Sequence, residues 1–146
     1  MTSERIDPPP AGDEDSQLHG FLDYHRATLQ MKAADLDATG LARTLPPSDM
    51  TLGGMLKHVA LNEDNWFSVF LHGNERAEPW RDDHAIGRSR ELVAGMDLAT
   101  LSARRLRGAD EQVTLRWIVL HTTEEYARHN GHADLIRESI DGVVGE

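Results

Sequence analysis

The chain has 146 residues, of which 39% are hydrophobic and 27% charged, and it carries a formal net charge of −10 at pH 7. This length suits one domain with a single core, and the composition is that of a globular protein rather than a disordered one. The absence of cysteine excludes disulfides and thiolate ligands. No apolar run approaches the roughly 20 residues that span a bilayer, and the negative net charge disfavours nucleic acid and membrane partners. A cytoplasmic protein is therefore expected.

Residues 1–12 contain three consecutive prolines and no periodicity, so we predict a disordered N-terminal arm ahead of a single domain over 13–146. A first helix is predicted over 15–39, because acidic and capping side chains stand at its start, and Gly40 is its expected stop. Its inward stripe repeats at steps of three and four and consists of Leu18, Leu22, His25, Leu29, Ala33 and Leu36.

The tandem prolines 46–47 predict a loop, since proline cannot continue a helix. A second helix is expected after a cap at Ser48 or Thr51, and it runs to about His72. Its stripe consists of Leu52, Met55, Leu56, Val59, Glu63, Trp66 and Phe70. The following residues, 75–83, are expected to form a connection.

A third, shorter helix is predicted over about 85–96. Residues 97–113 are interpreted as a short helical turn followed by a loop at 107–110. The last helix is expected over about 114–141, with Gly142 as its C-terminal cap. No alternation typical of strands occurs, so the predicted fold is all-α, a bundle of helices.

The inward face of the last helix carries three polar groups, Glu125, His129 and His132, between apolar ends. Burying a lone carboxylate costs several kcal/mol unless it is paired, protonated or bound to a metal. Spacings of four and three place all three groups on one helix face, which is how a helix presents ligands to one ion. The alternative that the pattern leaves open is a buried hydrogen-bond network without metal.

His58 on the second helix offers a further donor, since bundles build metal sites from facing helices. With Glu125 and His129 it gives nitrogen and oxygen donors that suit divalent zinc or nickel, or else manganese or iron, and leave a position open, as catalytic sites do. Taken alone, His58 is also explained as a histidine at the edge of the core. His25 of the first helix fits packing, or a hydrogen bond to a ligand, better than direct ligation.

Four segments resemble the DinB-like superfamily and, more narrowly, its mini-circle-protein branch. They are FLDYHRATL from Phe21, TLGGMLKHVALNEDNWF from Thr51, EPW from Glu78, and LRWIVLHTTEEYARHNGHADLIRESIDG from Leu115. The resemblance covers most of residues 15–142. It is weaker over 81–108, where this chain is shortened.

The resemblance implies a four-helix bundle with a long crossover connection, a shortened third helix and a homodimer. It implies a metal site between the second and fourth helices, where His58 and His129 match ligand positions. Glu125 stands where the superfamily commonly has histidine, and in this the chain is similar to mycothiol-dependent maleylpyruvate isomerases. His132 is then either a fourth ligand or an acid–base residue.

Two functions are compatible with these patterns. In the first, the chain is a metal-dependent transferase or isomerase that uses a low-molecular-weight thiol such as mycothiol on small electrophiles, with His132 or His25 moving a proton. In the second, it is a non-catalytic, stress-associated bundle that binds a metal or a small ligand. An open coordination position beside a cavity would favour the enzyme, whereas a closed four-ligand site would favour binding alone.

Overall fold

The computed structural model describes residues 4–76 and 82–145. These residues form five α-helices, one π-helical segment and a two-stranded antiparallel sheet. In chain order the elements are α1 Glu14–Ala33, α2 Ala38–Leu41, α3 Leu52–Glu63, η1 Asp64–Leu71, α4 Asp82–Val93, β1 Leu101–Arg105, β2 Gln112–Thr114 and α5 Leu115–Asp141. The structure is mainly helical, as the sequence predicts, but the small sheet means that it is not all-α.

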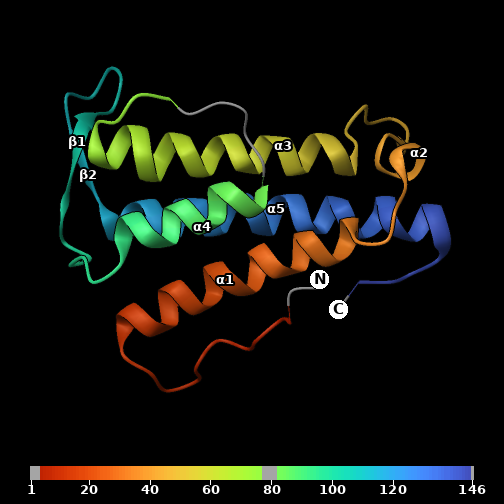
Figure 1. The fold of residues 1–146 in the computed structure, drawn as a ribbon, viewed down its shortest axis with the longest axis horizontal. Helices are drawn as coiled ribbons and strands as arrows, with labels where there is room; N and C mark the ends of the chain where they lie inside the picture. Colours follow the sequence, from red (N-terminus) through yellow and green to blue (C-terminus); the bar gives the residue numbers. More distant parts are fainter. Residues whose placement is uncertain (1–3, 77–81, 146) are drawn as a thin grey trace.

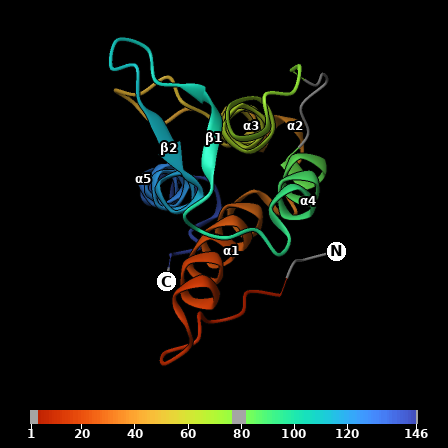
Figure 2. The ribbon, with the colours of Figure 1, turned by 90° about the vertical axis from the view of Figure 1, so that its left-hand side faces the viewer.

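The long helical segments α1, α3 with η1, α4 and α5 surround one core (Figures 1 and 2). Helix α1 packs mainly against α5, and α4 packs against α3 and η1. Helices α3 and α5 lie side by side along most of the molecule's length (Figure 1). The hairpin of β1 and β2 lies across one end, where it contacts η1 and leads into α5 (Figure 2).

The core is built mainly from aliphatic side chains, and Phe67 and Tyr126 are its largest fully buried members. Fully burying a leucine or isoleucine side chain stabilises the fold by about 1.5–3 kcal/mol. Both α3 and α5 contribute several such residues, so burial fixes these two helices relative to each other. The largest fully buried aliphatic members from α1, α3 and α5 are Leu22, Leu29, Leu52, Met55, Val59, Leu115, Ile118, Val119 and Ile136.

The segment before α1 lies against that helix. Residues 4–12 contain no helix or strand, and Asp13 then caps α1. Gln17 Nε2 donates hydrogen bonds to the carbonyl oxygens of Pro9 and Pro10, both at 3.3 Å. These bonds join the proline segment to the first turn of α1.

Helix α1 ends at Ala33 and not at Thr39, so the predicted end of the first helix is wrong. Asp35 adopts a left-handed φ of 60°, and Asp37 then caps α2 by accepting a 2.8 Å hydrogen bond from Gly40 N. Gly40 therefore lies within α2 and does not stop the first helix. Aspartate tolerates the left-handed region and caps helices well, and here these local preferences outweigh the apolar periodicity.

The second predicted helix is confirmed, although part of it is not an α-helix. Thr51 caps α3 by accepting a backbone hydrogen bond at 3.0 Å, and the helical chain continues to Leu71, close to the predicted end at His72. From Asp64 onward the chain is π-helical, so each carbonyl accepts from the fifth residue along. Gly73 follows with a φ of 75°, a conformation that glycine adopts without steric cost.

A β-hairpin occupies part of 97–113, so the predicted helical turn and the prediction of a strand-free fold are wrong. Val113 N donates to Ser102 Oγ at 3.0 Å, and these two buried side chains face the interior. Since only one of them is apolar, the strands show no alternation that the sequence could reveal. The predicted loop at 107–110 is the connection between the strands.

Helix α4 lies slightly nearer the N-terminus than the predicted range of 85–96. Within the described residues it has 12 residues, against 20 in α1 and 27 in α5. Residues 77–81, which include most of the predicted connection and the EPW segment, lie outside the described residues.

Helix α5 agrees closely with the predicted last helix. Thr114 caps it by accepting a 3.2 Å hydrogen bond from Trp117 N, and it ends at Gly142, which has a φ of 77°. In the part of the chain that the structure describes, no helix combines the length and the apolar character needed to cross a membrane. The longest helix is thus held at both ends by local capping, and it presents a long face to α3.

Candidate metal centre

Helices α3 and α5 run antiparallel, and their facing sides form a seam. On α3, His58 and Asn62 are four residues apart, and on α5 Glu125 and His129 have the same spacing, so each pair occupies one helix face. His58 lies opposite His129, with ring centroids 4.8 Å apart, and Asn62 lies opposite Glu125. The two pairs therefore bring four polar side chains together on the seam.

His58, Glu125 and His129, here called the triad, are the three residues predicted as metal ligands, and the structure places them together. Nε2 of His58 and Nε2 of His129 each lie 3.6 Å from Oε2 of Glu125, and all three ligand atoms lie within 4.8 Å of one another. Tetrahedral zinc with Zn–N bonds of about 2.0–2.1 Å holds neighbouring donors roughly 3.3 Å apart. Small side-chain movements would therefore bring these donors to a coordinating geometry.

The triad lies at the edge of the core and is open to solvent on one side. The His129 side chain is 12% exposed, Glu125 is 23% exposed, and His58 is 44% exposed. A cavity of about 290 Å³ adjoins the two histidines, and its other lining residues are Asp49, Met50, Thr51, Gly54 and Met55. The donor set thus has a buried end on α5 and an accessible end on α3, beside a space that a small molecule can enter.

The electrostatics of the triad favour neutral imidazole at His129. Burial lowers the pKa of His129, the neighbouring His58 lowers it further, and the Glu125 carboxylate opposes both effects. A histidine ligand must be neutral to offer its lone pair to a metal. His129 therefore meets this requirement at neutral pH.

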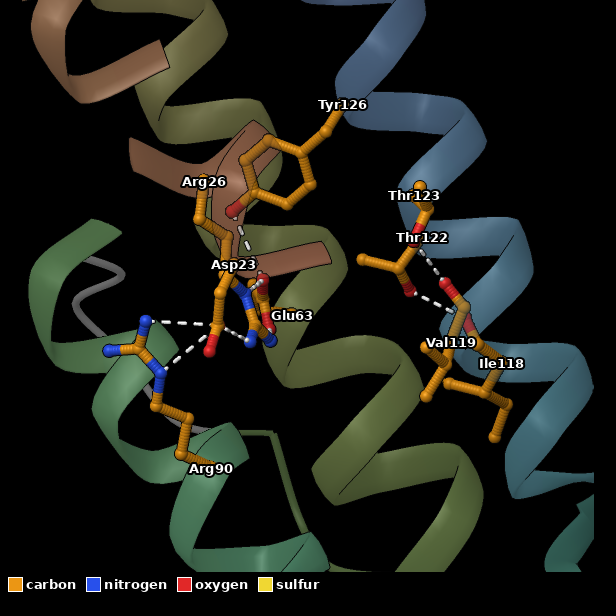
Figure 3. A network of polar contacts seen from close by, with 9 residues as sticks. All are labelled: Asp23, Arg26, Glu63, Arg90, Ile118, Val119, Thr122, Thr123 and Tyr126. Atoms are coloured by element: carbon orange, nitrogen blue, oxygen red, sulfur yellow. Dashed lines mark hydrogen bonds and ion pairs between the residues drawn. The ribbon is translucent and has the colours of Figure 1, made fainter. Parts of the chain in front are cut away.

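A buried ion pair lies in the interior next to the seam (Figure 3). Arg26 of α1 donates from Nε and Nη2 to the two carboxylate oxygens of Glu63 on α3, both at 2.7 Å, and Tyr126 Oη of α5 donates to Glu63 Oε1 at 3.0 Å. Asp23 accepts from Arg26 at 2.9 Å and from Arg90 of α4 at 3.0 Å. This network links all four long helical segments.

Sequence reasoning missed this network, although it placed Glu63 on the core stripe of the second helix. Burial acts to lower the pKa of Arg26, but the Glu63 carboxylate outweighs it and holds that pKa above its ordinary value. The missed signal was Arg26 itself, which stands between Leu22 and Leu29 on the buried face of α1. A buried cation needs a buried anion, and Glu63 was the available one.

His25 and His132 do not join the triad: within the described residues, the set of possible ligands contains neither of them. His25 Nδ1 lies 3.3 Å from Asn130 Nδ2, which also donates to the His25 carbonyl oxygen at 3.0 Å, and burial lowers the pKa of His25. His132 is half-buried. At this level of α5 the buried residues are Tyr126 and Asn130. Each of them directly follows a residue that was predicted to face inward, Glu125 or His129, so the predicted inward face is displaced by one residue.

Beyond Asn62 and Glu125 the seam continues as an aromatic cluster of Trp66, Trp117 and His121. The His121 ring stacks on Trp117 at 4.8 Å with an interplanar angle of 12°, and Trp66 packs edge-on against both rings. His121 precedes Glu125 by one helical turn, and Trp117 is 38% exposed. The triad therefore has an apolar, partly exposed neighbour on the same two helices.

The model of the mycothiol-S-transferase family matches residues 17–85 and 82–142, which together make up most of the chain. The chain belongs to the mycothiol-S-transferase family. This is a DinB-like family, so the resemblance stated from the sequence motifs is confirmed at that level. The matched residues include both helices of the seam and every residue of the triad.

The chain is also similar to the protein argonaute of Cereibacter sphaeroides (strain ATCC 17025 / ATH 2.4.3). The two are 29% identical over 87 residues, which make up 55% of this chain and 11% of that protein. The match thus spans only about a tenth of that relative's length. Membership of the mycothiol-S-transferase family therefore rests on the family model.

Proposed function

We propose that the chain is a divalent-metal-dependent transferase or isomerase that uses a low-molecular-weight thiol, such as mycothiol, on small electrophiles. The observation that carries the proposal is the triad: three donors from facing helices converge beside an open cavity. Membership of the mycothiol-S-transferase family supports the choice of a thiol. The chain has no cysteine, so the reacting thiol group must come from a second molecule.

The donor chemistry of the triad fits such an ion. Two imidazole nitrogens and one carboxylate oxygen suit zinc or nickel, with manganese and ferrous iron as further candidates. When bound, the ion supplies Lewis acidity, which lowers the pKa of a thiol or water brought to it. Glu125 offsets part of the positive charge, and His129 remains neutral because of its burial.

In the proposed transfer, the S–H bond of the thiol breaks and a C–S bond forms at the electrophilic carbon. The proton passes to a base, and a leaving group, where the substrate has one, departs with the bonding electron pair. We assign the proton transfer to His132 or His25. Burial lowers the pKa of His25, so this imidazole is neutral and able to accept a proton near pH 7.

We infer that α1, α3 with η1, α4 and α5 form a DinB-like four-helix bundle with a long crossover connection, and that the chain acts as a cytoplasmic homodimer. The packing of these segments around one core supports the bundle. The net charge of −10 supports a small-molecule substrate over a nucleic acid.

A second candidate is a metal- or ligand-binding protein that catalyses nothing. The observation in its favour is that the His25 ring, one of the two expected acid–base groups, contacts the Asn130 side chain, with His25 Nδ1 3.3 Å from Asn130 Nδ2. A centre whose expected base is engaged by another side chain can still bind an ion. The enzyme and the metal-binding form of the second candidate differ in turnover and not in metal content.

The experiment measures bound metals by elemental analysis of the purified protein and of the variants His58→Ala, Glu125→Ala and His19→Ala. The same samples are then assayed for consumption of mycothiol in the presence of small electrophiles. His19 is the matched control, because its contact is a 3.6 Å pair with Asp15 on the surface of α1.

The proposal predicts one transition metal per chain and thiol consumption, with both lost in the two triad variants and kept in His19→Ala. Stoichiometric metal without turnover on any electrophile would favour the binding protein. No metal after reconstitution with zinc, nickel, manganese and ferrous ions would overturn the enzyme and the metal-binding form of the second candidate.

A further inference from the structure

We propose that Asn62 supplies a fourth protein ligand to the candidate metal centre, through its amide oxygen Oδ1. This inference rests on the metal site of the proposed function and not on its thiol chemistry. Asn62 Nδ2 lies 3.1 Å from His58 Nε2 and 3.5 Å from Glu125 Oε2. Both distances are shorter than the 3.6 Å between those two ligand atoms, so the amide forms a compact triangle with them.

Without an ion, the amide of Asn62 presents its NH₂ group to the ligand atoms. That group donates toward the Glu125 carboxylate and lies against the lone-pair nitrogen of His58. A cation bound to these atoms would repel the positively polarised NH₂ group. The electrostatics therefore favour turning the amide over when an ion binds.

Turning the amide over breaks no other hydrogen bond within the part of the chain that the structure describes. Among residues 4–76 and 82–145, nothing in the structure donates a hydrogen bond to Asn62 Oδ1. The terminal torsion of asparagine is broad and roughly two-fold, so the two orientations are both available to the side chain. Half a turn about that bond exchanges Nδ2 for Oδ1 and directs the carbonyl oxygen to the ion.

The resulting donor set is two imidazole nitrogens, one carboxylate oxygen and one amide oxygen. Asparagine carbonyl oxygens are established ligands of hard divalent cations, and oxygen donors suit manganese. Asn62 therefore raises the affinity for manganese relative to zinc. As a neutral donor it is also the ligand most easily displaced by an incoming anion.

The test compares metal binding by the wild type, Asn62→Ala, Asn62→Asp and the control Asn65→Ala. Asn65 is a suitable control because it lies in η1 and its Oδ1 accepts a 3.3 Å hydrogen bond from Arg76, away from the triad. Titration calorimetry with zinc and with manganese gives the affinities. The visible absorption of the cobalt-loaded protein reports the ligand set, and circular dichroism checks the fold.

The proposal predicts that Asn62→Ala weakens binding at least about 10-fold, more for manganese than for zinc, and changes the cobalt absorption. Asn62→Asp should strengthen binding and shift the cobalt absorption, because a charged carboxylate oxygen replaces the neutral amide oxygen, and Asn65→Ala should match the wild type. If Asn62→Ala proves unfolded, a folded Asn62→Asp with wild-type affinity for every ion and an unchanged cobalt spectrum overturns the proposal.

Unchanged affinity and absorption in Asn62→Ala overturn the assignment of Asn62. Weaker binding with an unchanged cobalt spectrum overturns it too, because Asn62 would then only orient His58. In both cases the wild type still binds its ion and the proposed function stands. A wild type that binds no ion overturns both proposals together.

Discussion

Glu63 and Tyr126 meet in the interior, where Tyr126 Oη donates a 3.0 Å hydrogen bond to Glu63 Oε1 (Figure 3). Glu63 directly follows Asn62 in the chain, and Tyr126 directly follows Glu125. The buried contact therefore joins α3 to α5 at the level where Asn62 and Glu125 approach each other on the seam. The contact and the candidate metal centre thus use adjacent residues of the same two helices.

Replacing Tyr126 by phenylalanine should lower the free energy of unfolding by about 1 kcal/mol, the usual net value of one hydrogen bond. Glu63 keeps its two bonds to Arg26, so no charge is left unpaired. Urea denaturation measures the change. Tyr24→Phe is the control, because no hydrogen bond from the Tyr24 hydroxyl occurs among the described residues; equal losses in both variants would contradict the prediction.

Replacing Glu63 by glutamine should cost more, about 3 kcal/mol or above, because it removes the main charge partner of buried Arg26. Asp23 remains beside the guanidinium but is itself partly exposed. The matched control is Glu124→Gln on the exposed face of α5, which should change stability by less than about 0.5 kcal/mol. A Glu63→Gln variant as stable as this control would show that the ion pair contributes nothing.

Metal-free protein should lose stability as pH falls from about 7 through the histidine range. Burial lowers the pKa of His25 and, with the help of His58, that of His129, whereas the unfolded chain has ordinary values. Between these values the unfolded state binds more protons, so the free energy of unfolding rises with pH. Urea denaturation with chelator present measures the slope, and His25→Gln should make it shallower.

Binding of the ion should stabilise the fold, because the triad joins α3 to α5 only in the folded state. At a free metal concentration of one hundred times the dissociation constant, the gain is about 2.7 kcal/mol. Thermal melts should show this rise in the wild type, its reversal by chelator, and its absence in His129→Ala. A stabilisation that persists in His129→Ala would place the ion somewhere else.

The parts of the fold that the sequence predicts well are those specified by local chemistry. The caps Thr51 and Thr114 and the terminal Gly142 define α3 and α5. Gly142 is the expected C-terminal cap, Thr51 is one of the two expected caps of the second helix, and Thr114 caps the last helix at the residue where that helix was predicted to begin. The three ligand candidates follow from the same regularity, since a four-residue spacing places Glu125 and His129 on one helix face. Their meeting with His58 followed from the expectation of facing helices.

The parts that the sequence does not predict depend on contacts between distant segments. The pairing of Arg26 with Glu63 joins residues 37 positions apart, and no local pattern specifies it. The hairpin has one buried apolar side chain, Val113, so its alternation is too short to detect. The break after Ala33 accompanies a left-handed backbone conformation at Asp35, which the apolar periodicity through Leu36 does not reveal.

The π-helical segment Asp64–Leu71 gives this molecule a point at which chain length can change. A π-helix holds more residues per turn than an α-helix, so deletion of one residue here leaves a regular α-helix. The wider turn absorbs the extra residue, so the residues after the segment keep nearly the same orientation around the axis whether that residue is present or not, and His58 and Asn62, which precede the segment, keep their places. Single-residue insertions and deletions in this stretch would therefore let homologues vary the chain around Trp66 while retaining the same donors to the ion and the packing beyond the segment.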